Sequence, residues 1–456
     1  MSRDDALRVH VKKLICARSI DGFDVADLER RADELDGSLD AALDLVRSLS
    51  SARRRSDWPY HEPDGLEDIH DASAPLRSLG KIQDVPLGEA SARVESAFLG
   101  SVCGCILGKP VEFNPSLATL EALFRAVGEW PICNYVSEKL RPGTEAHLGW
   151  SMSYWNRTYR EHIQFVMPDD DLNYSILGML LLEAWGTGLT TDYVRQAWGM
   201  HLPISSTFGP ERSTLGYLAL EGELPEPFTT LLTGGDPRGV RHCGAQIRAD
   251  TYGYACPGNP ALAADLAFQD ASLTHRGSGL YATMWTAAAI AVAQTAPVDP
   301  LDIFRVANQY VPQESRFLEA VARGLSLVES ATDWRSGYEA IHAELGGCGG
   351  SHCAVFEESA TLINTLKFAR RVDDGICMQV MQGNDTDSYG ATAGSLLGAY
   401  FGPGLLDHER WIAPFNDTLH TSLAWFYESS LSAVAKRMGD LPRRLAQGEA
   451  SGHTNR

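Results

Sequence analysis

The stretch that decides the fold is Gly383-Asn384-Asp385-Thr386-Asp387-Ser388-Tyr389-Gly390-Ala391-Thr392-Ala393-Gly394, which runs on through Ser395 to Phe401. Its first half places two carboxylates and two hydroxyls within four residues, and no Lys or Arg occurs from Gln382 to His408. Such carboxylates repel one another unless a cation or backbone N–H groups neutralise them. Its second half predicts a helix over 389–401, whose small side chains let another helix axis approach closely. We therefore expect a buried helix that starts at a cation site.

Helical periodicity extends over most of the chain, with little sign of strands. We expect helices at residues 4–19, 24–35, 38–52, 92–107, 117–127, 172–186, 192–200, 213–221, 260–274, 279–295, 301–310, 315–329, 353–370, 389–401 and 417–437. Several are rich in Ala and Gly, as in 282–293, which suits the inside of a large bundle. The sequence therefore predicts an all-α protein.

The chain has 456 residues, more than a usual domain, yet no Pro-, Gly- or Ser-rich linker clearly divides it after about residue 90. We expect a helical N-terminal extension with a polar connection over 1–90. A large single-domain bundle should span 91–440, and a flexible tail should span 441–456.

A second acidic cluster, Pro168-Asp169-Asp170-Asp171, opens the apolar helix that starts at Leu172. Three acids are more than a helix N-terminus requires, although an N-cap alone remains an alternative for this cluster. A plain Asx-turn is likewise the alternative for Asp385 to Ser388. If the two clusters complete one site, its oxygen-only ligands favour magnesium, manganese or calcium over zinc.

Composition restricts the function class. The formal charge is −20, from 59 acids against 39 bases, which argues against a nucleic-acid partner because phosphate neutralisation needs clustered Lys and Arg. Nine irregularly spaced cysteines show no zinc pattern and indicate reduced thiols. The longest near-apolar run, 284–293, is too short to span a bilayer, and no signal segment opens the chain. We expect a cytoplasmic protein without a membrane partner.

An ordered set of motifs resembles the ADP-ribosylglycohydrolase family. The set is Gly100-Ser101-Val102-Cys103-Gly104 with Gly108-Lys109-Pro110-Val111-Glu112, then Asp169 to Asp171, then Gly383 to Ser388. Further similar segments are Gly244-Ala245-Gln246-Ile247-Arg248, Pro257-Gly258-Asn259-Pro260 and Thr274-His275, so the resemblance covers roughly residues 92–405. It implies an orthogonal helical bundle around two magnesium ions, with manganese as the alternative. It also implies hydrolysis of the bond that joins ADP-ribose to its acceptor.

Carried over to this chain, the resemblance implies metal ligands at Asp170, Asp171, Asp385, Asp387 and Ser388. We include Asp169 as a further candidate ligand, although the family usually has Thr or Ser there. Cys105 is a second departure, since the family commonly has Asp at that place. Glu112 matches a glutamate that sits over the metal centre, and either Glu112 or Asp170 would accept a proton from the attacking water.

The resemblance also implies a substrate-binding set, formed by Gly244, Gln246, Arg248, His275 and Tyr281. Arg248 is expected at a diphosphate, with a buried ion pair to Asp250 or Asp270 as the alternative. His275 is expected beside the ribose, with a purely structural role as its alternative, and Tyr281 is expected to stack on a base. The Trp-rich insert 150–155 is either an enclosing lid or core packing.

We therefore expect a metal-dependent hydrolase that cleaves a ribosyl glycosidic bond of an ADP-ribosylated or NAD-derived substrate, which is either a protein or a small molecule. Two alternatives remain: a protein of the same fold that binds ADP-ribose or a nucleotide without turnover, and a helical protein whose acids only cap helices. The leaving group and the oligomeric state are not indicated by the sequence.

Overall fold

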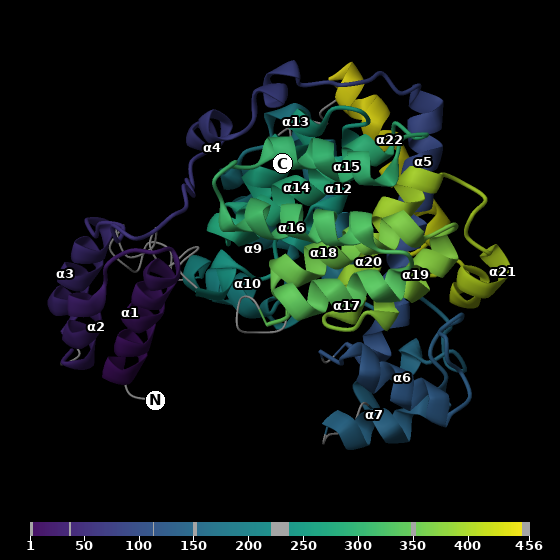
Figure 1. Cartoon of the computed structure of the whole chain (residues 1–456), viewed down its shortest axis with the longest axis horizontal. Coiled ribbons are helices and arrows are strands. Elements are labelled where there is room, and N and C mark those ends of the chain that lie inside the picture. The colour runs from purple at the N-terminus through teal and green to yellow at the C-terminus, as the bar shows by residue number, and fades with distance from the viewer. Residues whose placement is uncertain are drawn as a thin grey trace.

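The computed structural model describes residues 3–35, 38–112, 114–148, 153–219, 237–347 and 353–448. Within them the chain forms helices and isolated β-bridges, with no strand, so the all-α prediction is confirmed (Figure 1). The helices are α1 (Arg3–Ile20), α2 (Ala26–Asp33), α3 (Leu39–Ser50), α4 (Leu66–Ala72), α5 (Leu87–Gly108), α6 (Leu117–Ala126), α7 (Arg141–Leu148), α8 (Asp170–Trp185), α9 (Thr191–His201), α10 (Gly209–Leu218), α12 (Asp250–Ala255), α13 (Pro260–Ala271), α14 (Gly277–Ala293), α15 (Pro300–Ala307), α16 (Arg316–Ser330), α17 (Trp334–Leu345), α18 (Val355–Phe368), α19 (Val372–Met381), α20 (Thr386–Phe401), α21 (His408–Trp411) and α22 (Leu431–Gln447).

Helix α14 forms the centre of the main bundle. Every residue from Gly277 to Ala293 is buried, and the helix is apolar on all sides, as expected for a helix surrounded by others. Helices α12, α13, α15 and α20 pack around it. The predicted helix over 279–295 is thus confirmed, with a start two residues earlier at Gly277.

The contact between α5 and α20 positions the acidic residues. A Cβ added at Gly104 would lie 1.9 Å from the carbonyl oxygen of Gly390, and one at Gly390 would lie 2.5 Å from that of Gly104. Gly100 and Gly394 meet in the same way, so the helices run antiparallel with their backbones touching. The C-terminal end of α5 therefore lies against the N-terminal end of α20, where the Thr386 hydroxyl donates a hydrogen bond of 2.9 Å to the Gly108 carbonyl.

Helix α5, continued to Val111, is the one candidate membrane span by length and composition among the described residues. In the structure it is 72% buried over that apolar window. It packs on α19, α20 and α22, which is the situation of a core helix in a bundle.

The N-terminal helices α1, α2 and α3 form a small unit with a core of its own, which includes Val11, Leu14 and Leu28. Figure 1 shows this unit beside the main bundle, joined to it by the connection that carries α4. Arg316 of α16 links the two, since its guanidinium pairs with Glu62 at 2.6 Å and with Asp21 at 3.3 Å.

Two predictions near the C-terminus are wrong. The predicted helix over 417–437 is irregular up to Ser430, because Asn416 and Asp417 adopt a left-handed backbone and the Asp417 carboxylate accepts hydrogen bonds from Ser430 and Ser432. The helix begins only at Leu431. It continues to Gln447 with Leu441 and Pro442 buried, so the first part of the predicted flexible tail belongs to the bundle. Residues 449–456 lie outside the described part.

Candidate active site

Three chain segments meet at the junction of α5 and α20. The first is the short 3-10 turn η2 (Lys109–Val111) with Glu112, the second is the N-terminus of α8, and the third is the N-terminus of α20. The close packing of glycines in α5 and α20 fixes η2 against the N-terminus of α20. The N-terminus of α8 joins them through Ser388, whose hydroxyl donates to Asp171 Oδ2 at 3.4 Å. The two acidic clusters that the sequence singled out therefore lie together.

Lys109 lies between these clusters, and its role was not anticipated from the sequence. Its Nζ is 2.7 Å from Asp169 Oδ2, 2.9 Å from Asp387 Oδ2 and 2.7 Å from Glu112 Oε2. One ammonium group thus bridges three carboxylates from three segments. The signal in the sequence is the position of Lys109 three residues before Glu112, within the glycine-rich motif.

Asp169 combines two roles. It is the N-cap of α8, where its Oδ1 accepts a hydrogen bond of 3.2 Å from the Asp171 N–H, so the capping alternative holds for this residue. Its Oδ2 pairs with Lys109. Both oxygens of Asp169 are therefore engaged by the protein, while its predicted role as a metal ligand stays a prediction.

Burial and crowding shift the pKa values of the acids. Burial and the charge of Asp169 raise the pKa of Asp170 and of Asp171 well above the usual value. Burial and Asp387 raise the pKa of Asp385 to about 7. Burial alone would raise the pKa of Asp387 as well, but the charge of Lys109 and the hydrogen bonds with Asp385, Glu112 and Lys109 together outweigh burial and lower this pKa to about 2. The site thus holds more carboxylates than one ammonium can neutralise.

The donor set fits a hard divalent cation. Asp170, Asp171, Asp385, Asp387 and Ser388 offer only oxygen atoms, which Mg²⁺ and Mn²⁺ accept readily. The Oδ1 atom of Asp171 is buried and has no hydrogen-bond partner among the described residues. A buried carboxylate oxygen without a donor indicates a missing partner of positive charge. Cys105, which stands where an acid was expected, lies with its sulfur within 4.8 Å of carboxylate oxygens of Asp169 and Asp171.

The acids form one wall of a cavity of about 670 Å³. Asp170, Asp385, Asp387, Ser388 and Glu112 line it on one side. The rest of the lining comes from the start of α10 and from the turns before η8 (Gln246–Arg248) and α18, with Asn114 in addition. These lining residues are Phe208, Gly209, Pro210, Glu211, Arg212, Ser213, His242, Cys243, Gly244, Ile247 and Cys353. A cavity of this size accommodates a ligand as large as a nucleotide.

The profile of the family described as ADP-ribosylglycohydrolase matches residues 88–446, which is well over half of the chain. This protein belongs to the ADP-ribosylglycohydrolase family. A solved structure titled "ADP-ribosylglycohydrolase-related protein complex" is similar at 18% sequence identity and a TM-score of 0.50, over 78% of this chain and 99% of the other. That likeness supports the shared fold alone. A search of curated proteins gives no match.

Membership supports a hydrolase that acts on ADP-ribosylated substrates. Of the substrate-binding residues that the family resemblance implied, Gly244 lies in the cavity lining. A Cβ at this position would lie 2.6 Å from Glu211 Oε1, so a glycine is needed for the backbone to approach the cavity wall. Gly244 is therefore part of the cavity wall, while its predicted contact with a substrate stays a prediction.

Arg248 lies behind that wall. Its guanidinium is 1% exposed and pairs with Asp270 at 2.6 Å and Glu211 at 2.8 Å. It also donates to the Gly244 carbonyl at 2.6 Å. This is the buried ion pair that was the alternative to diphosphate binding, with Asp270 rather than Asp250 as partner. In this ADP-ribosylglycohydrolase, Arg248 supports the segment that lines the cavity.

The other three members of the set are also buried outside the described lining. Gln246 donates to Thr286 and Ser359, both at 3.0 Å. His275 Nδ1 lies 2.7 Å from the Thr274 hydroxyl. The Tyr281 hydroxyl donates to the Pro63 carbonyl at 2.6 Å, so the polar connection covers this tyrosine. Their predicted contacts with a substrate stay predictions. Residues 150–152 of the predicted lid lie outside the described part.

Proposed function

We propose that this protein is a hydrolase that depends on a divalent metal ion and cleaves the glycosidic bond at ribose C1 of an ADP-ribosylated or NAD-derived substrate. The observation that carries the proposal is the meeting of Asp170, Asp385, Asp387 and Ser388 at the wall of a nucleotide-sized cavity. Ser388 is hydrogen-bonded to the buried Asp171, whose Oδ1 has no hydrogen-bond partner among the described residues.

These five residues would hold Mg²⁺, with Mn²⁺ as the alternative. When bound, such an ion supplies a Lewis acid that orients the ribose hydroxyls and lowers the pKa of a coordinated water. The side chains of the protein accept the proton. Glu112 and Asp170 line the cavity, which supports our choice of these two carboxylates as the candidates that take the proton from the attacking water. The water oxygen forms the new bond to C1 as the bond to the leaving group breaks.

Lys109 sets the charge of the site. Its ammonium pairs with Asp387 and Asp169, and it contributes to lowering the pKa of Asp387 to about 2, so the protein can keep Asp387 ionised before a metal arrives. Its pairing with Glu112 at 2.7 Å also fixes the orientation of that carboxylate.

Phe208 and Arg212, at the start of α10, also line the cavity. Phe208 is 57% exposed, and the Arg212 guanidinium carbon lies 5.1 Å from its ring centroid. An exposed ring beside a guanidinium suits stacking on a base and pairing with a phosphate. We therefore assign this edge to the adenosine diphosphate half of the substrate.

The test is to incubate the full-length protein and Mg²⁺ with NAD, ADP-ribosyl-arginine, ADP-ribosyl-serine and simple nucleosides, and to identify released products by mass. We expect release of free ADP-ribose from at least one ADP-ribosylated substrate and its loss with chelator. In Asp387→Asn, turnover should fall at least about 100-fold, as for loss of a metal-shell group. Asp84→Asn is the matched control, because the Asp84 side chain is 93% exposed. Release that survives chelation, or equal activity of the two variants, would disprove the proposal.

The alternative function, binding of ADP-ribose without turnover, is favoured by one observation. Lys109 already places a cation between Asp169 and Asp387, so the site has a built-in counter-charge. Calorimetric titration with ADP-ribose would select this function if it showed saturable binding while no substrate in the panel released a product.

A further inference from the structure

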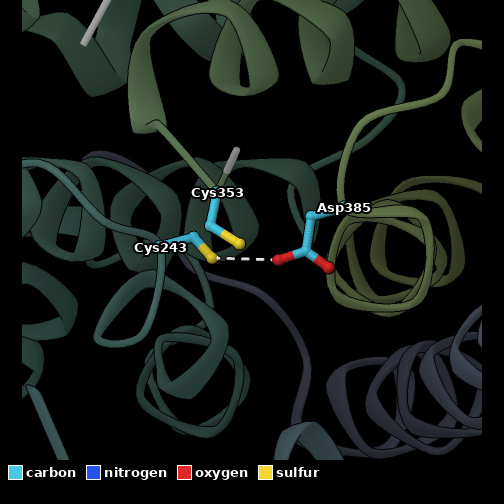
Figure 2. A group of neighbouring side chains, drawn as sticks. All are labelled: Cys243, Cys353 and Asp385. Atoms are coloured by element: carbon cyan, nitrogen blue, oxygen red, sulfur yellow. Dashed lines mark hydrogen bonds between the residues drawn. The ribbon is translucent and has the colours of Figure 1, made fainter. Parts of the chain in front are cut away.

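Two cysteines line the cavity next to Asp385 (Figure 2). The sulfurs of Cys243 and Cys353 and a carboxylate oxygen of Asp385 all lie within 4.8 Å of one another. The Cys243 thiol donates a hydrogen bond to Asp385 Oδ2 at 3.3 Å. Figure 2 shows both sulfurs and the carboxylate pointing toward one another. Three potential ligand atoms from distant parts of the chain therefore converge at the cavity wall.

The backbone holds the two cysteines in place. His242 and Ala354 form an antiparallel bridge, and the Cys243 N–H donates to the Cys353 carbonyl at 2.9 Å. Cys353 has a φ of 61°, a left-handed conformation that is unfavourable for a non-glycine residue. The bridge thus fixes a conformation that brings the second sulfur to the same side as the first.

A buried carboxylate behind this group gives an independent sign of a missing cation. Glu358 is 3% exposed, and its Oε1 accepts the Asp385 N–H at 3.0 Å. Its Oε2 is buried and has no hydrogen-bond partner among the described residues. A buried carboxylate oxygen without a hydrogen-bond partner therefore lies one hydrogen bond away from Asp385 and its two neighbouring sulfurs.

We propose that Cys243, Cys353 and Asp385 form a binding site for a borderline-soft divalent cation of the Zn²⁺ type on the cavity wall. Around a tetrahedral zinc ion, sulfur and oxygen ligands lie about 3.5 to 4 Å apart, so the three groups need to move by only about 1 Å. Each thiol releases its proton to solvent as it coordinates. The fourth position faces the cavity and is open to water or to a substrate group.

This site differs in chemistry from the oxygen-only site beside it. Thiolate ligands select zinc-like ions, whereas carboxylates and hydroxyls suit Mg²⁺ and Mn²⁺. The two sites share Asp385, so an ion on the cysteines withdraws that ligand from the oxygen-only site. This consequence, inhibition by Zn²⁺ that depends on the cysteines, rests on the proposed function, whereas the site itself does not.

The test uses Co²⁺ as a spectroscopic probe on the full-length protein, reduced with a phosphine and held without added Mg²⁺. We expect a thiolate-to-cobalt charge-transfer absorption that saturates at one equivalent and is displaced by Zn²⁺. Cys243→Ser and Cys353→Ser should each weaken Co²⁺ binding at least about 10-fold. Cys16→Ser, which changes an exposed thiol, and Cys377→Ser, which changes a buried one, are the controls and should leave the band unchanged.

Circular dichroism melting of each variant shows whether it folds. No charge-transfer band in the wild type overturns the proposal, as does a band that persists in both folded variants, Cys243→Ser and Cys353→Ser. Because the readout is absorbance rather than turnover, the proposal of the cysteine site stands even if the protein hydrolyses no substrate. Conversely, if the protein hydrolyses a substrate but gives no cobalt band, the proposed function stands and the proposal of the cysteine site is wrong.

Discussion

At the scale of single residues, Lys109 is the side chain that connects the acidic segments of the site. It pairs with acids from three segments and is itself 11% exposed. Burial alone would lower the pKa of Lys109, but the charges of Asp169 and Asp387 outweigh it and raise that pKa well above the usual value. The Lys109 ammonium is therefore charged at neutral pH and acts as a permanent counter-ion to the carboxylates around it.

Replacing Lys109 by Met should make folding dependent on a divalent ion. The substitution leaves Asp169, Asp387 and Glu112 without their cation, and loss of one partner of a buried pair costs about 3 to 5 kcal/mol. Mg²⁺ should recover much of this loss, because it binds the freed carboxylates in the folded state. Thermal melting should show a larger rise in Tm on adding Mg²⁺ for Lys109→Met than for the wild type. Lys81→Met, at a 50% exposed lysine, is the control, and an equal rise in all three proteins would contradict the prediction.

Asp250 should make stability fall with rising pH. It is 1% exposed and accepts hydrogen bonds from Ser395 at 2.5 Å and Ser101 at 3.4 Å. Burial raises its pKa from 3.8 to about 7, so the folded state favours the protonated form. The stabilisation is complete below pH 3.8 and is lost as the pH rises through about 7.

The shift of the Asp250 pKa from 3.8 to about 7 corresponds to about 4 kcal/mol. Asp250→Asn mimics the protonated acid, so its free energy of unfolding should drop less between pH 4 and pH 8 than that of the wild type, by up to that amount. Urea denaturation at both pH values measures this difference. Asp302→Asn, at a 51% exposed side chain, should follow the wild type. Parallel pH curves for Asp250→Asn and the wild type would rule the prediction out.

Prediction from the sequence succeeded for some site residues and failed for others. Asp170, Asp171, Asp385 and Asp387 stood out because uncompensated acids at helix starts need a cation, and the structure brings their two clusters together. Lys109 was missed because its neighbours in the turn η2 do not reveal which residues at the N-termini of α8 and α20 it pairs with. These residues lie 60 and 278 positions away.

At the scale of elements, the small-residue pattern of α20 was the most informative signal. It predicted close helix packing, but its partner helix was not evident, since Gly100, Gly104 and Gly108 look like any run of glycines within an apolar helix. The acidic residues belong to the helices rather than preceding them. Helix α8 begins at Asp170 instead of the predicted residue 172, and α20 begins at Thr386 instead of residue 389. Helix α17 was missed although Asp333 and Ser336 form a capping box at its start.

Gly104→Ala should destabilise the α5–α20 contact. The added methyl would lie 1.9 Å from the Gly390 carbonyl oxygen. A carbonyl group in the backbone of a packed helix cannot move aside as the end of a flexible side chain can. Overpacking of this kind costs about 1 to 3 kcal/mol or more, and it would also displace Lys109 from the acids. The matched control is Gly199→Ala in α9, where nothing lies within 4 Å of the new Cβ. That change should stabilise the protein slightly, by up to about 1 kcal/mol. Denaturant midpoints measure both, and a midpoint for Gly104→Ala at or above that of the wild type would contradict the close-packing argument.

At the scale of the whole molecule, the site exists only because segments far apart in the chain converge. The all-α class followed from periodicity, while the convergence of Asp169 to Asp171 with Asp385 to Ser388 followed from the resemblance to a family. Tertiary contacts between residues so far apart leave no local mark. The same reason explains Arg248, Gln246 and Tyr281, whose motif could be recognised but whose burial depends on partners elsewhere in the chain.

Arg316 is a main polar contact between the N-terminal unit and the bundle, beside the hydrogen bond of 2.6 Å between the Tyr217 hydroxyl and His10. Arg316 pairs with Glu62 and Asp21, donates to the Ile20 carbonyl at 2.8 Å, and lies 4.7 Å from the Trp58 ring centroid. Glu62 is almost fully buried by this contact, at 1% exposure of its side chain. Removing the guanidinium would leave a buried carboxylate unpaired, which favours release of the segment that carries it.

Arg316→Met should therefore loosen the unit formed by α1, α2 and α3 without melting the bundle. Trypsin should cut the variant at Arg53, Arg54 and Arg55 several-fold faster than the wild type, because Arg54 is held in the wild type by the carbonyls of Asp21 and Glu62 at 3.2 and 2.8 Å. The main thermal transition should stay within a few degrees, since the core of α5, α14 and α20 is untouched. Arg323→Met is the control, because Arg323 pairs with Glu344 on the exposed face of α16. Equal cleavage of the two variants would show that the attachment is spread over the apolar contacts of the connection instead.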